Sequence, residues 1–207
     1  MRNNFIHWHY LMCPTLLFFT CILFLNCNNR KIEYTDALKQ CNDKLAENGQ
    51  TAIALSPECI VGSVFPSFEC TTIHQKTTNA AYFKGKVSIV NFWFENCAPC
   101  VAEVPGLNQL VKTYGKDKLR YLAISPDSQE DVATFLKQHE WDFDHVGDGK
   151  SLIKDVFQLA WGYPTTFLVD QNGIIVKNIS GGTSDASAVQ HIQEQLMPSI
   201  DRLLKGN

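Results

Sequence analysis

The sequence predicts an α/β fold in which a central mixed sheet carries helices on both faces. Segments with strand and helix patterns alternate along most of the chain, an order typical of α/β domains. Residues 87–94, Val-Ser-Ile-Val-Asn-Phe-Trp-Phe, are almost continuously apolar, which indicates a strand buried on both faces. Near the C-terminus, Asn172-Gly173 separates two apolar runs. This dipeptide predicts an antiparallel hairpin at the end of the sheet.

The other elements follow from local patterns. Before the buried strand, spaced apolar residues predict a helix over 33–48, and an apolar stretch after Gly62 predicts a first strand over 65–73. After it, the patterns predict a helix over 98–114, a strand over 119–125, and an amphipathic helix over 129–139. The remaining predictions are a weak strand over 141–146, a short helix over 151–157, hairpin strands over 165–170 and 174–179, and a C-terminal helix over 185–204.

The composition is that of a globular protein with a substantial core. The chain has 207 residues, of which 45% are hydrophobic and 19% are charged, and this balance argues against global disorder. A formal net charge of -3 does not favour a nucleic-acid partner. We expect a signal over 1–27, a helical extension or linker over 28–55, and one globular domain over 56–207.

The first 27 residues have the pattern of an export signal. The apolar stretch 11–25 would span about 22 Å as a helix, less than the ~30 Å hydrocarbon core of a bilayer. Cys27 follows this stretch directly, and the arrangement resembles a bacterial lipoprotein signal in which the cysteine is lipidated. An uncleaved anchor and simple secretion remain as alternatives. All three place the domain outside the cytoplasm, facing the periplasm or the cell exterior, and the first two attach it to the membrane.

The eight cysteines fall into three groups. Cys13 and Cys21 lie within the signal, where they act as small apolar residues, and Cys27 is the candidate for lipid attachment. Cys97 and Cys100 form the one C-x-x-C motif of the chain. Cys41, Cys59 and Cys70 remain. In an oxidising compartment two of these three could pair, or all three could be buried free thiols.

The motif Cys97-Ala98-Pro99-Cys100 lies where the buried strand ends and a predicted helix begins. At a helix N-terminus, free N–H groups and the helix dipole stabilise a thiolate, so we expect Cys97 to be the reactive thiol. The spacing brings both sulfurs to one side of the helix start, which suits a disulfide. The alternatives are a static disulfide or half of a zinc site. A zinc site would need a second pair of ligands, and His139 and His145 are not suitably spaced.

Two separated motifs resemble the thioredoxin superfamily. Residues 90–100, Val-Asn-Phe-Trp-Phe-Glu-Asn-Cys-Ala-Pro-Cys, are similar to the active-site segment of thioredoxins. Residues 161–170, Trp-Gly-Tyr-Pro-Thr-Thr-Phe-Leu-Val-Asp, resemble the strand that follows their cis-proline. The most similar subgroup is the exported TlpA-like thiol–disulfide oxidoreductases, which include the reductases of cytochrome c maturation. The resemblance covers about residues 62–204 and implies a thioredoxin-like fold.

The resemblance implies a role for several residues. Cys97 would be the attacking thiolate and Cys100 the resolving thiol. Pro164 would follow a cis peptide bond, with Tyr163 exposing backbone for substrate beside Cys97. Substrate would also contact Asn96, Ala98 and Pro99. The family usually has tryptophan where this chain has Asn96, which leaves the docking partner open.

Glu103 is the candidate acid–base residue. TlpA-like proteins often carry a carboxylate three residues after the second cysteine, whereas thioredoxins have a buried aspartate six residues before the first. In this chain the residue six positions before the first cysteine is Asn91, which cannot act as a carboxylate. The alternative is that Glu103 is an ordinary exposed glutamate in the first turns of a helix.

The resulting hypothesis is an exported protein disulfide reductase. It would exchange its Cys97–Cys100 dithiol with protein thiols and disulfides, without a diffusible cofactor or metal, and would receive electrons from a membrane redox protein. One alternative is a peroxiredoxin-like peroxidase, but such enzymes carry Thr or Ser where this chain has Phe94. The other is a copper or zinc carrier that binds metal through Cys97 and Cys100.

Overall fold

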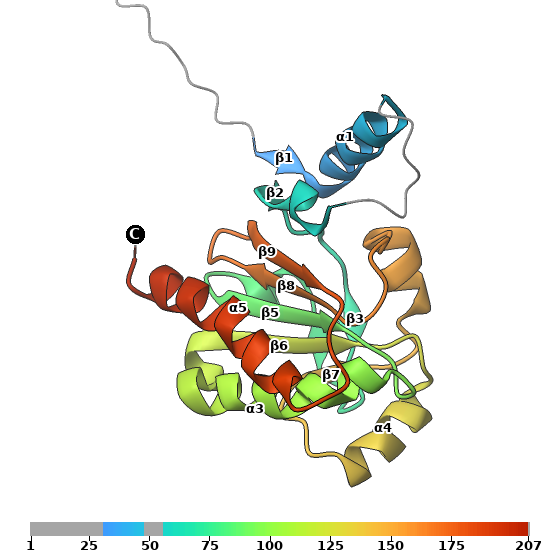
Figure 1. The fold of residues 1–207 in the computed structure, drawn as a ribbon. Helices are drawn as coiled ribbons and strands as arrows, with labels where there is room; N and C mark the ends of the chain where they lie inside the picture. Colours follow the sequence, from blue (N-terminus) through green and yellow to red (C-terminus); the bar gives the residue numbers. More distant parts are fainter. Residues whose placement is uncertain (1–30, 48–55, 207) are drawn as a thin grey trace, which may run out of the picture. The chain divides into compact units, whose positions relative to one another are not determined.

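A computed structural model of the chain describes residues 31–47 and 56–206 (Figure 1). Its centre is a five-stranded sheet in the order β7-β6-β5-β8-β9. The strands are β5 (Val87–Phe92), β6 (Leu119–Ile124), β7 (Asp144–Val146), β8 (Thr165–Val169) and β9 (Ile175–Ser180). β5, β6 and β7 are mutually parallel, whereas β8 is antiparallel to β5 and to β9. The predicted mixed sheet and its C-terminal hairpin are therefore confirmed.

The four long helices agree closely with the predicted ranges, whereas the short helix Ala80–Phe83 was not predicted. The helices are α1 (Tyr34–Glu47), α2 (Ala80–Phe83), α3 (Ala98–Lys118), α4 (Gln129–Gln138) and α5 (Ser187–Leu204), together with a 3-10 turn, η2 (Pro57–Ile60), and a π-helical turn, η3 (Leu152–Val156). α3 is longer than predicted because its residues stay helical almost to β6, interrupted at Gly115 with φ of 77°. A side chain would be strained at that angle, and glycine is not.

The strands of the sheet centre divide their side chains between two cores. Ile89 and Leu168 lie in one cluster with the apolar residues of α3, α4 and α5. Val90 and Phe167, each one position away, lie in the other cluster with α1 and η3. This alternation is the two-residue period of a strand. Every residue of β5 and β8 is buried, as the continuous apolar run of β5 predicts.

The start of α1 packs against the face of the sheet that carries Val90 and Phe167. The hydroxyl of Tyr34 donates a hydrogen bond to the carbonyl of Phe157 over 2.6 Å, and the Tyr34 ring packs against Phe167. A disulfide joins Cys41 of α1 to Cys59 of η2, with 6.0 Å between the Cα atoms. The described residues from Lys31 onwards form one compact unit, so α1 belongs to the same body as the sheet.

The predicted strand over 65–73 is wrong. The described structure has only short ladders in this region: β2 (Ser63–Val64) pairs with β1 (Ile32–Glu33), and β3 (Cys70–Thr71) pairs with β4 (Thr77–Thr78). Phe65 and Phe68 are both buried although they are three positions apart, a spacing that one face of a strand cannot supply. Both rings pack against Phe83 and Phe157. Aromatic packing therefore decides the course of this segment.

Candidate active site

Cys97 and Cys100 form a disulfide at the start of α3, with 5.2 Å between their Cα atoms. Cys97 is the N-cap of the helix, and its sulfur accepts a hydrogen bond from the backbone N–H of Cys100 over 3.3 Å. Cys97 is 4% exposed, whereas Cys100 is fully buried. An attacking partner can therefore approach Cys97 only, and the N–H groups of the helix start would stabilise its thiolate after reduction.

Glu103 lies on the same helix and is buried, only 4% exposed. Its Oε1 accepts a hydrogen bond from Nδ2 of Asn91 over 2.8 Å, and the same amide donates to Oγ1 of Thr166 over 2.9 Å. Burial raises the pKa of the Glu103 carboxyl to about 8, although the hydrogen bond from Asn91 opposes this shift. Glu103 is thus not the exposed helix residue of the alternative interpretation, and its carboxyl titrates near neutral pH.

The peptide bond between Tyr163 and Pro164 is cis, the geometry that the resemblance implies. The backbone at Gly182 lies close to both motifs. A β-carbon built on Gly182 would lie 3.4 Å from Cγ of Pro164 and 3.6 Å from Cβ of Pro99. Pro164 itself accepts a hydrogen bond at its carbonyl from Gly181 over 2.9 Å. The structure therefore brings the C-x-x-C motif and the cis-proline together, as predicted.

The surface around Cys97 has an aromatic wall and polar neighbours. The rings of Phe94 and Tyr163 meet edge to face, with 5.3 Å between their centroids. Asn96 and Ala98 are exposed, and Tyr163 is half-buried. Burial raises the pKa of the Tyr163 hydroxyl, and a smaller rise comes from the negative charge of Asp127. These residues could contact a docked protein segment.

Sequence reasoning missed the residues that support the site. Asp127 Oδ2 accepts hydrogen bonds from the backbone N–H of Glu95 and from the hydroxyl of Ser125, each over 2.8 Å. Asp127 thereby ties the turn after β6 to the loop that leads into Cys97. The sequence offered one signal for Asp127: it lies just beyond the end of β6, the strand next to β5 in the sheet. Thr166, two residues after Pro164, gave no comparable signal.

The other predicted sites have different outcomes. Cys27 lies outside the described residues. Cys41 pairs with Cys59, which answers a question that the sequence left open, and Cys70 is a half-buried free thiol whose Sγ lies 2.7 Å from Oγ1 of Thr78. Within residues 31–47 and 56–206, no group of three or more His, Cys, Asp or Glu side chains is arranged to hold a metal ion.

The fold and the site with its paired cysteines together define a thioredoxin-like protein that carries out thiol–disulfide exchange. Residues 61–178 match the AhpC/TSA family, and the chain belongs to that family. The chain is 29% identical over 136 residues to the thiol-disulfide oxidoreductase ResA of Bacillus thuringiensis subsp. konkukian, covering 65% of this chain and 78% of that protein. It is 31% identical over 126 residues to the thioredoxin-like protein YneN of Bacillus subtilis, covering 59% and 72%.

A solved structure supports the same conclusion. The thioredoxin domain of a thiol-disulfide oxidoreductase from Bacteroides vulgatus superposes with a TM-score of 0.54 at 26% identity, over 65% of this chain and 96% of that domain. The chain is therefore a thiol–disulfide oxidoreductase with a thioredoxin-like fold.

Proposed function

We propose that the protein is an exported disulfide reductase in which Cys97 attacks and Cys100 resolves. The Cys97 thiolate attacks a partner disulfide, forms a mixed disulfide and releases one partner thiolate, which takes up a proton. Cys100, as a thiolate, then attacks the Cys97 sulfur and releases the second partner thiol. Two electrons and two protons pass to the partner, and the Cys97–Cys100 disulfide remains. No diffusible cofactor or metal enters this cycle.

The observation that carries this proposal is the difference between the two sulfurs. Cys97 caps α3 and borders the surface, whereas Cys100 is buried behind it and can act only after Cys97 has been engaged. We further propose that Glu103, as a carboxylate, takes the proton of Cys100 during resolution. A carboxyl whose pKa is about 8 can accept and return a proton near neutral pH.

The location that we propose is the outer side of the cytoplasmic membrane, with attachment through the N-terminal segment. The pattern of residues 1–27 and the candidate lipid attachment at Cys27 support export, as does the Cys41–Cys59 disulfide, because structural disulfides persist in oxidising compartments. In the described part of the chain, no helix has the length and apolar character needed to cross a bilayer. A membrane redox protein would supply the electrons, and the resemblance favours cytochrome c maturation as the setting.

Trapping tests the assignment of attacker and resolver. We expect Cys100→Ser to accumulate a mixed disulfide between Cys97 and an oxidised protein substrate, because no second thiol can release it. Non-reducing electrophoresis and peptide mapping would identify the bond. Cys97→Ser is the matched control and should trap far less, since Cys100 is buried. Equal trapping by both variants would contradict the assignment.

The proposed docking at Tyr163 and Pro164 has its own test. We expect Pro164→Ala to slow exchange with a protein disulfide by about tenfold or more, because the backbone beside Cys97 would no longer be held for an extended substrate segment. Exchange with a small disulfide, which needs no such docking, should change much less. If both rates fall equally, Pro164 supports the cysteines and does not dock substrate.

A further inference from the structure

The central sheet has two distinct ends, and the active site occupies only one of them. β5 begins at Val87 and ends at Phe92, and Cys97 follows beyond Phe92. Six strand residues place these ends about 17 Å apart. At the Val87 end, Leu119 of β6 pairs with Val87, and the β8–β9 turn follows Val169, which pairs with Ser88.

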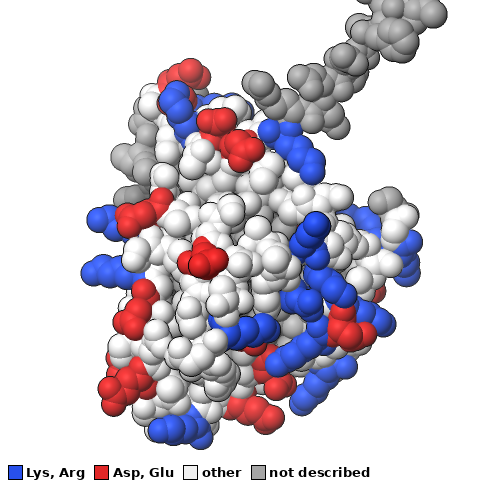
Figure 2. Space-filling model, turned by 180° about the vertical axis from the view of Figure 1, so that it is seen from behind, with Lys and Arg blue, Asp and Glu red and all other residues white. Residues whose placement is uncertain are grey.

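Lys and Arg side chains gather at the end opposite Cys97, which we call the basic end. It comprises the residues before β5, around the start of β6 and at the end of α5: Lys84, Lys86, Lys116, Lys118, Arg120, Arg202 and Lys205. Gln171 in the β8–β9 turn donates a hydrogen bond to the carbonyl of Leu203 over 2.9 Å, which brings the end of α5 to this place. In Figure 2, Lys and Arg side chains gather on the right, with red Asp or Glu side chains among them; this side lies on the left in Figure 1, where the C-terminus is marked.

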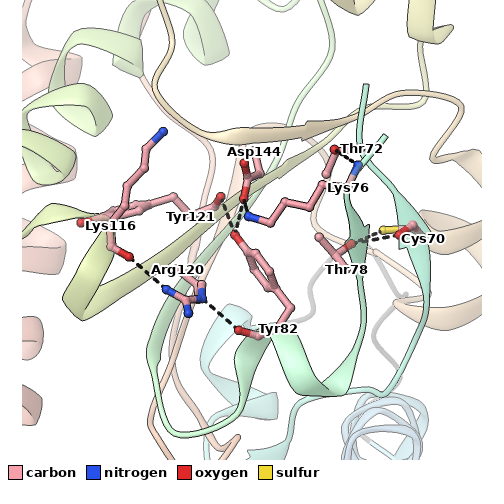
Figure 3. A network of polar contacts seen from close by, with 9 residues as sticks. All are labelled: Cys70, Thr72, Lys76, Thr78, Tyr82, Lys116, Arg120, Tyr121 and Asp144. Atoms are coloured by element: carbon pink, nitrogen blue, oxygen red, sulfur yellow. Dashed lines mark hydrogen bonds and ion pairs between the residues drawn. The ribbon is translucent and has the colours of Figure 1, made fainter. Parts of the chain in front are cut away.

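The described structure leaves these cations without carboxylate partners. Its two ion pairs, Lys39–Asp43 and Lys76–Asp144, do not involve the basic end. Lys86 donates instead to the backbone carbonyl of Asp117, and the guanidinium of Arg120 donates to the carbonyls of Tyr82 and Lys116 (Figure 3). Carbonyl groups orient a cation but do not cancel its charge, so this charge remains available to an outside anion.

The acidic side chains nearby are engaged within the fold. Asp170 accepts hydrogen bonds from the backbone N–H groups of Asn172 and Ile174, and Asp201 accepts one from the hydroxyl of Tyr114 over 2.8 Å. Asp117 is exposed but lies between two lysines in the chain. These hydrogen bonds leave the carboxylate charges in place, but the seven cations of the basic end outnumber these three carboxylates. The basic end therefore keeps a positive surface in a protein whose formal net charge is -3.

A small pocket beside the basic end has a lining of net positive charge. Its volume is about 70 Å³, and Lys116, Arg120 and Lys76 line it together with Tyr82 and Asp144 (Figure 3). Asp144 is paired with Lys76 over 2.7 Å, and the charge of Lys116 also acts on this carboxylate. The pocket therefore has three cations and one carboxylate in its lining, which gives it a net positive charge.

Lys31, the first described residue, contacts the domain at the same end. Nζ of Lys31 donates to the carbonyl of Asn172 in the β8–β9 turn over 3.5 Å. Asn172 also lines an apolar groove of about 320 Å³, whose other walls include Phe65, Phe83 and, at its edge, Lys84. Basic side chains next to apolar surface are the combination that binds anionic membrane interfaces.

We propose that the basic end rests on a membrane surface of anionic lipids, so that Cys97 faces away from the bilayer towards its protein partners. This inference rests on the membrane attachment proposed above, and it adds an orientation that the attachment alone does not fix. The attachment would keep the domain close to the bilayer, and the attraction between its cations and anionic headgroups would select one end.

Lysine protection tests the orientation. The full chain is reconstituted into vesicles of phosphatidylcholine alone or mixed with phosphatidylglycerol, and a membrane-impermeant amine reagent is applied. We expect modification of Lys84 and Lys118 to be at least about threefold slower on the anionic vesicles, whereas Lys150 and Lys154, beyond the other end of the sheet, stay unchanged. High salt should abolish the difference, because it screens these charges. Peptide mass mapping gives the rate at each lysine.

Charge-reversal variants provide the matched control. Lys84→Glu with Lys118→Glu should abolish the protection of the remaining lysines of the basic end, while Lys150→Glu with Lys154→Glu should leave it intact. All variants should reduce a small disulfide at the wild-type rate. If the protein floats with both kinds of vesicle but its lysines react equally on both, the orientation is wrong. If it fails to float with either, the proposed membrane attachment is wrong.

Discussion

At the residue scale, the pairing of Asn91 with Glu103 defines the acid–base character of the site. The amide of Asn91 cannot supply a carboxylate, but it donates to Glu103 and to Thr166 in a buried position. This bond stabilises the carboxylate and limits the rise in its pKa, which burial keeps at about 8. In the described structure, Glu103 thus provides a buried carboxyl that can exchange a proton near the pH at which thiols react.

The first prediction concerns the stability cost of Glu103. The folded state holds a proton on Glu103 up to about pH 8, whereas the unfolded chain releases it near 4.5. The stability of the oxidised protein should therefore fall as pH rises between these values, by roughly 1.4 kcal/mol per pH unit at most. Glu103→Gln, neutral throughout, should lack this contribution. Urea unfolding at pH 5 and pH 8 measures the difference.

A matched control separates this effect from a general change of charge. Glu194 is exposed on α5, so Glu194→Gln should shift the free energy of unfolding little at either pH. If Glu103→Gln and wild type show parallel pH profiles, the Glu103 pKa is not raised in the folded protein.

The second prediction concerns Asp127, which holds the loop before Cys97. Asp127→Ala removes the acceptor for the Glu95 N–H, so we expect exchange with a protein disulfide to slow by about threefold to tenfold. Asp127→Asn keeps an oxygen acceptor and should remain close to the wild-type rate. Stopped-flow exchange kinetics with both variants would decide. An equal loss in both would assign the effect to the charge of Asp127 rather than to its hydrogen bond.

At the element scale, a cluster of aromatic side chains packs around Trp93 at the end of β5. Trp93, directly after β5, contacts Phe135 and Trp141, each with ring centroids 4.8 Å apart. His145 of β7 meets the Trp141 ring edge-on at 5.0 Å and is 1% exposed. Within the described structure, neither of its ring nitrogens has a hydrogen bond of normal geometry. Burial lowers the pKa of His145 to about 3, with the backbone of Trp141 opposing the shift.

The third prediction follows from this neutral histidine. Between about pH 6.5 and pH 3 the unfolded chain binds a proton at His145 that the folded protein excludes, so stability should fall as the pH is lowered through this window. His145→Phe should remove that loss, which at pH 5 amounts to about 2 kcal/mol. Thermal unfolding at pH 7 and pH 5 measures it. His191→Gln, on the exposed side of α5, is the control and should not reduce the acid sensitivity.

At the scale of the whole molecule, a second disulfide attaches α1 to the domain. Cys41 and Cys59 are 18 positions apart, whereas Cys97 and Cys100 are three apart. Cross-linking a longer segment removes more freedom from the unfolded chain. The Cys41–Cys59 bond is therefore the one that stabilises the fold, and the Cys97–Cys100 bond is the one placed to react.

The fourth prediction compares the two bonds. Replacing Cys41 and Cys59 by serine should lower the free energy of unfolding by about 3 kcal/mol. The matched pair Cys97→Ser with Cys100→Ser should lower it less and abolish disulfide exchange. Chemical denaturation and a protein-disulfide reduction assay measure the two effects. If the Cys41 and Cys59 variant keeps full stability, the packing of Tyr34 and Leu38, not the disulfide, holds α1 in place.

The elements with a regular spacing of apolar residues were predicted well from the sequence. The all-buried strand β5, the hairpin turn at Asn172-Gly173 and the four long helices appear where the apolar periodicity placed them. The segment after Gly62 was predicted wrongly as a strand, because its aromatic residues pack in a cluster with Phe83 and Phe157, which lie further along the chain. The assignment of Cys97 as the attacking and Cys100 as the resolving cysteine remains a prediction, although the structure places both at the helix start that these roles require.

The sequence by itself determined the order of the elements, the paired cysteines and the class of chemistry, since each depends on residues that are close together in the chain. Only the tertiary structure decided that Cys41 pairs with Cys59, that Glu103 is buried against Asn91 and Thr166, and that Asp127 holds the loop before Cys97. It also showed a basic end in a chain of net negative charge. Burial, pKa and local charge are set by which distant segments meet in the folded chain, and no local pattern of residues encodes that.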